Sequence, residues 1–146
     1  MVCLLAPAVN VLYLKQPNKD LLSGILSYKF LNKSKTLDNS LIVDFLNYYN
    51  FKEQLETINW STYDCVIFDR VQFISHFVYS SNSKILDKPY QDLINNYHLH
   101  ENSNIYILLD TASNILNRSN NRNSHSIYDK NYNIVIEKMF VINYLF

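Results

Sequence analysis

A chain of 146 residues is the size of a single domain, and its 13 basic and 13 acidic side chains leave no net charge; we therefore predict one domain over residues 1–146. This balance provides no charge field that would attract nucleic acid or an acidic membrane surface, so we expect neither as a partner. The chain has one glycine, which excludes a glycine-rich phosphate loop, because such loops need glycines to bring backbone N–H groups close to a phosphate.

The apolar runs are shorter than the roughly 20 residues that a membrane-spanning helix needs. The first residues, MVCLLAPAV, lack the basic segment that opens a signal peptide. We therefore expect a cytoplasmic location and no membrane. The two cysteines, Cys3 and Cys65, lie far apart, and the apolar run around Cys65 predicts a reduced, buried thiol.

The chain opens with a strand signal followed by helix signals. Val9–Leu14 predicts a short buried strand, which the turn signal Gln16-Pro17-Asn18 closes. Leu21–Leu31 predicts a modestly amphipathic helix with these residues near one face: Leu22, Ile25, Leu26 and Lys29. Thr36-Leu37-Asp38 predicts the start of a second helix, which runs towards Ile58. Its apolar residues recur at helical spacing: Leu41, Ile42, Phe45, Leu46 and Tyr49.

A second strand and further helical segments follow. Cys65–Phe68 is a continuous apolar run, typical of strands in parallel sheets. Helical segments are predicted around His76–Ser81 and Tyr90–Tyr97, before a third strand, Ile105–Leu109, that ends in Asp110. The remaining predicted segments are a helix at Ser113–Asn117, a polar loop at 118–125 and a helix at Tyr128–Leu145.

Alternating strands and helices predict an α/β domain with a mainly parallel sheet. Ligands of such sheets gather beyond the carboxyl ends of the strands. Pro17, the pair Asp69-Arg70 and Asp110 all follow predicted strands, so we expect them to border a cleft. From the residues alone, a structural ion pair at the end of the sheet is the alternative for Asp69-Arg70.

Two further patterns are weaker indications of a functional site. His98 and His100 have a spacing that could share a metal ion on a strand, but no third histidine, cysteine or aspartate accompanies them. We interpret them as surface histidines and predict no metal site. The aromatic clusters Tyr48-Tyr49 and Phe73-Phe77 are interpreted as core or cleft wall.

Several segments between residues 9 and 144 match motifs of one enzyme family in serial order. LKQPNKDLLSG at 14–24 is similar to "FPNR…G", and FLNYYNFKE at 45–53 is similar to "LLFxANRWE". DCVIFDR at 64–70 matches a strand that ends in "DRY", and FVYSS at 77–81 matches "GVAYSS". NIYILLD at 104–110 takes the place of "PDVVFYL", while NRS at 117–119 and IYDK at 127–130 match "NRS…EEIYEK". In this order the chain resembles the eukaryotic and viral form of thymidylate kinase, a nucleoside monophosphate kinase of the P-loop class.

The resemblance implies a three-layer fold, with a parallel sheet flanked by helices, and the transfer of a phosphoryl group from ATP to dTMP with Mg²⁺. In this chemistry catalysis consists mostly of positioning and of cations placed on the moving charge. By resemblance, Arg70 binds the dTMP phosphate, Asp69 lies near the magnesium and the phosphates, and Arg118 and Arg122 contact the donor phosphates from a lid. The remaining implied substrate-binding residues are Pro17, Lys19, Lys52, Phe73, Tyr79 and Tyr128.

The chain also departs from the family. The family begins with a strand and a "GxDGxGKST" loop, which supplies the phosphate cradle, the lysine and the magnesium-binding hydroxyl, whereas residues 1–10 contain no Gly, Lys, Ser or Thr. The family also continues beyond the lid helix, where this sequence stops. Phe51 replaces the arginine of "ANR" and Val71 the tyrosine of "DRY"; Lys52 restores a charge, although a point charge does not copy a guanidinium fork. We therefore expect the isolated chain to be inactive.

The missing first strand lies at the centre of the sheet in the family, which leaves a slot open to several interpretations. We leave four interpretations open. The first is that Met1–Ala6 fills the slot, and the second is that the two flanking strands close up. The third is that a neighbouring chain fills the slot in a homodimer, and the fourth is that the sequence is a fragment. Two functional alternatives also stay open. One is a degenerate homologue that binds a nucleotide or a protein without catalysis, and the other is a small α/β interaction protein with no nucleotide role.

Overall fold

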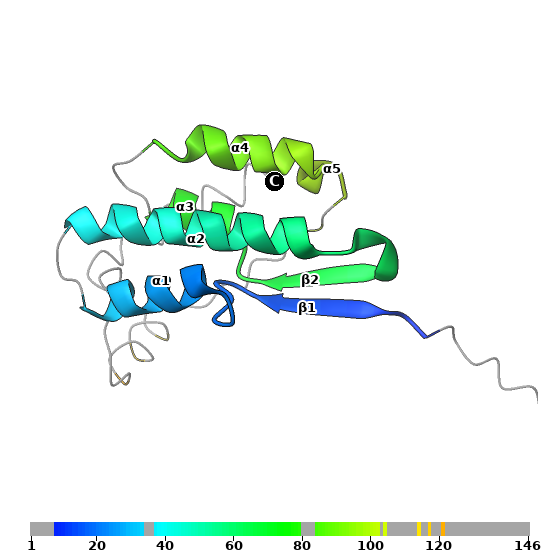
Figure 1. Ribbon diagram of the computed structural model, residues 1–146, viewed down its shortest axis with the longest axis horizontal. Coiled ribbons are helices and arrows are strands. Elements are labelled where there is room, and N and C mark those ends of the chain that lie inside the picture. Colours follow the sequence, from blue (N-terminus) through cyan, green and yellow to red (C-terminus); the bar gives the residue numbers. More distant parts are fainter. Residues whose placement is uncertain are drawn as a thin grey trace, which may run out of the picture.

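The computed structural model describes residues 8–33, 37–79 and 84–102, together with the single residues 104, 114, 117 and 121. Strands and helices alternate along this part of the chain (Figure 1). The elements are β1 (Val11–Lys15), α1 (Leu22–Lys33), α2 (Leu37–Thr57), the 3-10 turn η1 (Trp60–Thr62), β2 (Cys65–Asp69), α3 (Gln72–Tyr79), α4 (Asp87–Asn96) and α5 (Leu99–Asn102).

The two described strands pair in parallel, with α1 and α2 as the connection between them (Figure 1). The register runs from Val11 opposite Cys65 to Lys15 opposite Asp69. The predicted α/β class with a parallel sheet is thus confirmed for the described residues, which contain a two-stranded sheet. The predicted strand Ile105–Leu109 lies outside them, as do the later segments, apart from helical positions at Asn114 and Asn117.

The predicted segments up to residue 97 coincide with observed elements, although α3 and α4 begin earlier than predicted. In α4 the reason is Pro89, which breaks the apolar pattern but is tolerated in the first turn of a helix, where its missing N–H has no helical partner. The helix therefore begins at Asp87, ahead of the proline.

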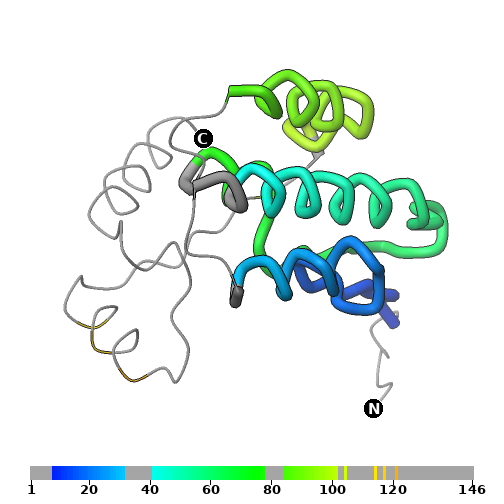
Figure 2. The backbone as a smooth tube through the Cα atoms, turned by 60° about the vertical axis from the view of Figure 1, so that its left-hand side comes forward, coloured from blue at the N-terminus to red at the C-terminus, as the bar shows by residue number. Residues whose placement is uncertain are grey.

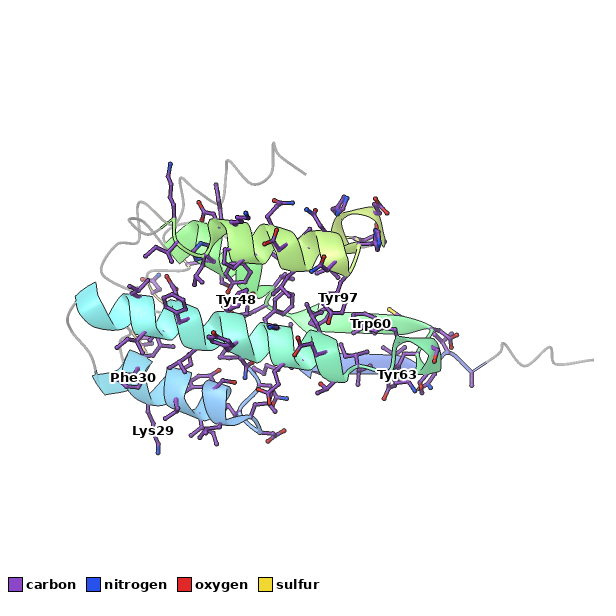
Figure 3. The ribbon with its side chains drawn as sticks, turned by 45° about the horizontal axis from the view of Figure 1, so that its top comes forward. Lys29, Phe30, Tyr48, Trp60, Tyr63 and Tyr97 are labelled. Atoms are coloured by element: carbon purple, nitrogen blue, oxygen red, sulfur yellow. The ribbon has the colours of Figure 1, made fainter. Side chains whose placement is uncertain are left out.

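Helix α2 lies between α1 on one side and α4 on the other (Figures 1 and 2). The core fills the space between α2 and α4 and consists of Phe51, Leu55, Leu86, Tyr90 and Leu93. Figure 3 shows Tyr48 and Tyr97 between these helices, and the Tyr48 ring meets the Tyr90 ring edge-on at 5.2 Å between centroids. The ring of Phe51 contacts Phe68 of β2 at 5.7 Å, which joins the sheet to the same core.

The predicted apolar face of α1 is wrong, and that of α2 is correct only in part, because Phe45 packs against the core. Leu22, Ile25, Ile42 and Tyr49 are exposed, whereas the buried positions of α1 are Gly24 and Ser27. The two helices pack along each other, and Ser27 Oγ donates a hydrogen bond to Asn47 Oδ1 at 2.5 Å. Because Gly24 and Ser27 are small and the contact of Ser27 with Asn47 is polar, hydrophobic periodicity does not reveal these positions.

One face of the sheet is exposed in the described residues. Side chains alternate along a strand, so Leu12, Leu14 and Phe68 are partly buried while Val11, Tyr13 and Ile67 are exposed. Cys65 belongs to the exposed face, and the prediction of a buried thiol is wrong; the cysteine is free. Cys3 lies outside the described residues. None of the described helices combines the length and the apolar character that crossing a bilayer requires.

Candidate functional site at the carboxyl edge of the sheet

The candidate site begins where both strands end. Asp69 is the last residue of β2 and faces Lys15, the last residue of β1. Beyond this pair, the Gln16 N–H donates to the Asp69 carbonyl oxygen at 2.9 Å, so the loop after β1 follows the end of β2. Pro17 and Asp69-Arg70 therefore follow the ends of neighbouring parallel strands, as predicted, but none of them lines the cavity described below. The peptide bond between Gln16 and Pro17 is cis.

Arg70 has an exposed side chain and a left-handed backbone, with φ of 68°. A residue with a Cβ adopts this conformation at a cost of about 1–2 kcal/mol, because the Cβ approaches the carbonyl oxygen that follows it. The turn reverses the chain between β2 and α3. Such strain is concentrated at functional sites, which makes Arg70 the first candidate for a ligand contact.

Tyr13 holds the carboxylate of Asp69. The phenol lies on the neighbouring strand and donates to Asp69 Oδ2 at 2.7 Å. This hydrogen bond, with desolvation and the charge of Asp69, raises the pKa of Tyr13, because each disfavours the phenolate. Asp69 is thus oriented on the exposed face of the sheet, beside the backbone of Arg70.

Asn50 ties the loop after β1 to helix α2. This fully buried side chain accepts the Asn18 N–H at 2.7 Å and donates to the Asn18 carbonyl oxygen at 3.0 Å. It also donates to Ser23 Oγ at 3.0 Å and accepts from Gln54 Nε2 at 2.9 Å. The Asn50 side chain therefore fixes the loop by bonding both the backbone N–H and the backbone carbonyl oxygen of Asn18. Sequence reasoning missed Asn50 and Tyr13, since their partners lie far away along the chain.

Gly24 allows the loop to cross α1. A Cβ at this position would lie 1.8 Å from the Asn18 carbonyl oxygen and 2.9 Å from Asn50 Nδ2. The single glycine of the chain is thus used for a close approach of one backbone to another. The same loop carries Lys19, whose Nζ lies 3.9 Å from the centroid of the Tyr28 ring in a cation–π contact.

The other residues implied by the family resemblance lie elsewhere or outside the described part. Lys52 forms an exposed ion pair with Glu56 at 3.6 Å, one turn along α2. Phe73 packs against the core, with its ring 6.5 Å from that of Phe51. The side chains of Tyr79, Arg118, Arg122 and Tyr128 lie outside the described residues. The structure therefore brings together Pro17, Asp69 and Arg70, with Lys19 on the same loop.

A cavity of about 310 Å³ lies between β1 and the end of α2, where Leu12, Leu14 and Ile58 are among its lining residues. Two of its lining residues, Asn18 and Leu21, belong to the loop between β1 and α1. Gln54 also lines it and is almost fully buried, with no hydrogen-bond partner for Oε1. We assign the candidate site to the charged edge, because none of the cavity's lining residues carries a charge.

Within the described ranges, no three His, Cys, Asp or Glu side chains are grouped so that they could hold a metal ion. His98 and His100 are exposed, as the sequence indicated. Each ring lies near the same carboxylate, with His98 Nδ1 at 3.3 Å and His100 Nε2 at 3.4 Å from Glu101 oxygens. Both contacts are exposed, and exposed polar contacts of this kind contribute little to stability.

The edge of the sheet is suited to bind an anion. Arg70 offers the planar fork of donors that matches a phosphate. Two further positive charges belong to Lys15, which pairs with Asp69 at the end of β1, and to Lys19, on the loop after β1. Asp69 supplies a carboxylate held by Tyr13.

No family model, no curated protein and no solved structure matches this chain.

Proposed function

We propose that the carboxyl edge of the sheet binds a nucleoside monophosphate, with dTMP as the first candidate, in the manner of the acceptor site of a thymidylate kinase. In this proposal the domain is an incomplete P-loop kinase-like fold with a three-layer sheet, located in the cytoplasm. The observation that carries it is the exposed side chain of Arg70 directly after β2, at the edge where the Gln16 N–H of the loop after β1 bonds the Asp69 carbonyl oxygen. Ligands of parallel sheets bind in this position.

In the proposed complex, Arg70 donates to two phosphate oxygens, and Lys19 leaves the Tyr28 ring to add a second positive charge. Asn50 keeps the loop backbone in place while the ligand binds. Tyr13 holds Asp69 on the exposed face, where its carboxylate selects against more highly charged ligands by repulsion. The outcome is a weak monophosphate site at the rim of the sheet.

The described residues do not fit MgATP. A phosphate cradle needs glycines, and the single glycine packs against Asn18, where even a methyl group has no room. We therefore propose binding without phosphoryl transfer for this chain. The alternative, an active thymidylate kinase, requires a glycine-rich phosphate loop that residues 1–146 do not contain.

The test is a titration of the isotope-labelled chain with dTMP, followed by NMR chemical shifts. We expect shifts at residues 16–20 and 69–71 and a Kd on the order of 10 mM or weaker, because one charge-assisted contact contributes about 1.5–3 kcal/mol. Arg70→Ala should remove most of the shifts, and inorganic phosphate and thymidine, titrated separately, distinguish phosphate from base recognition.

The matched control is Lys29→Ala. Lys29 is exposed on α1 and points away from the other elements (Figure 3). This variant loses one positive charge, as Arg70→Ala does, but the charge lies away from the edge. If dTMP binding were weakened equally in both variants, the effect of Arg70→Ala would come from net charge alone. An unchanged spectrum of the wild-type chain at high dTMP would contradict the proposal.

A further inference from the structure

The exposed face of the sheet continues inward from the charged edge. In the observed register Lys15 pairs with Asp69 at the end of the strands, and the next pair on the same face is Tyr13 with Ile67, because alternate residues of a strand share a face. Tyr13 is 60% exposed and Ile67 is 46% exposed. An aromatic ring and an aliphatic side chain are therefore cross-strand neighbours on the exposed face, directly behind the charged pair.

The phenol of Tyr13 is held in place although it is exposed. Its hydroxyl donates to Asp69 Oδ2 at 2.7 Å, and Asp69 directly precedes Arg70. Tyrosine has two side-chain torsions, so one hydrogen bond at the hydroxyl removes much of its freedom before a ligand binds. A side chain ordered in advance lowers the entropic cost of binding. Tyr13 thus offers a preorganised aromatic surface beside the edge.

Other aromatic side chains near the edge are engaged elsewhere. Phe73, which the family resemblance assigned to the substrate, packs against the core. The ring of Tyr28 lies under the Lys19 ammonium. Among the described residues, Tyr13 is the aromatic side chain that is exposed and also hydrogen-bonded to a residue of the edge.

The spacing between the charged edge and this aromatic ring fits a nucleotide. Residues on one face of a strand are two positions apart, which corresponds to about 7 Å along the strand. In a nucleoside monophosphate one sugar separates the phosphate from the base, and this separation is comparable. A phosphate bound by Arg70 therefore leaves the base within reach of Tyr13 and Ile67.

We propose that Tyr13 and Ile67 form a platform on which the base of the bound nucleoside monophosphate stacks. This inference rests on the proposed function and names the residues that contact the base. Stacking on an aromatic ring uses the π-face that every base has, so the platform accepts purines as well as pyrimidines. The ligand class is therefore nucleoside monophosphates of either kind rather than dTMP alone.

The contribution of the base is measured by comparing dTMP with deoxyribose phosphate, which lacks the base, in NMR titrations of the full chain. We expect dTMP and dAMP each to bind at least about fivefold more tightly than deoxyribose phosphate, which is the lower limit for stacking of one base. Tyr13→Val removes the ring but keeps a strand-forming residue, and it should abolish this difference. Tyr13→Phe keeps the ring and loses the bond to Asp69, and it should retain most of the difference.

The matched control is Tyr49→Val. Tyr49 is 56% exposed on α2, which packs against the opposite face of the sheet through Phe51 and Phe68, so the difference should persist in this variant. Thymidine, which lacks the phosphate, should shift the signals of Tyr13 and Ile67, and this measurement needs no variant.

The proposal is overturned if thymidine shifts neither Tyr13 nor Ile67, or if the preference for dTMP over deoxyribose phosphate persists in Tyr13→Val. Shifts of Tyr13 and Ile67 with thymidine, without any response to deoxyribose phosphate, would contradict the phosphate site at Arg70 and support the platform. The two proposals can therefore fail separately.

Discussion

The carbonyl oxygen of Asn18 occupies the space that a Cβ on residue 24 would need, since the two atoms would lie 1.8 Å apart. Alanine normally stabilises a helix by about 1 kcal/mol relative to glycine. Here the neighbouring atom belongs to a backbone that Asn50 holds from the other side, so it cannot move freely. The intrinsic preference of the helix is therefore reversed by the contact.

We predict that Gly24→Ala lowers the free energy of unfolding by about 3 kcal/mol, at the upper end of the usual cost of overpacking. The measurement is denaturant unfolding followed by circular dichroism. Leu22→Ala, at an exposed position on the same helix, is the control and should change stability by less than about 1 kcal/mol. A stabilised Gly24→Ala variant would show that the loop does not cross α1 at this point.

Arg70 combines a charge with a strained backbone, and two substitutions separate them. Arg70→Gly and Arg70→Ala both remove the guanidinium, but glycine has no Cβ and adopts the φ of 68° without strain. We therefore expect Arg70→Gly to be more stable than Arg70→Ala by about 1 kcal/mol. Thermal unfolding of both variants measures this difference, and equal stability would place residue 70 outside the left-handed region.

At the scale of elements, the sequence indicated the strands and helices that the structure describes up to residue 97, because long apolar-periodic segments and turn signals are local properties. The prediction of which face is buried failed for α1. Hydrophobic spacing pointed to Leu22 and Ile25, but α1 packs through Gly24 and Ser27, since the contact with α2 is a close approach with polar hydrogen bonds. The prediction of a buried Cys65 thiol failed for a related reason, because an apolar run does not tell which face of a two-stranded sheet is covered.

Asn50 is the side chain that joins one element to another at the candidate site, and we predict that Asn50→Ala costs about 2–4 kcal/mol. The substitution leaves the backbone groups of Asn18 without partners, and unsatisfied polar groups cost about 1–3 kcal/mol each. Denaturant unfolding measures the loss, and faster hydrogen exchange of the Asn18 amide locates it. Asn95→Ala, which removes an exposed amide of α4, is the control. Similar losses of stability in both variants would contradict the inference that the hydrogen bonds of Asn50 to Asn18 hold the loop.

At the scale of the whole molecule, the sequence placed Pro17 and Asp69-Arg70 at one edge because parallel strands end on the same side. The partners that hold this edge were not predictable. Tyr13 reaches Asp69 only in the observed register, and Asn50 reaches Asn18 only through the packing of α2 on the loop. Register and packing join residues that are distant in the chain, so no local pattern contains them.

The whole molecule also decides whether bound monophosphate can react. Phosphoryl transfer depends on cations and backbone donors placed around the moving charge, and the single glycine of this chain is enclosed between Asn18 and Asn50. We therefore predict that the 146-residue chain shows no dTMP kinase activity in a coupled assay of ADP release with dTMP and MgATP. An active thymidylate kinase in the same assay is the positive control. Turnover in the usual range of about 1–100 per second, abolished by Arg70→Ala but not by Lys29→Ala, would show that the edge catalyses phosphoryl transfer without a glycine-rich loop.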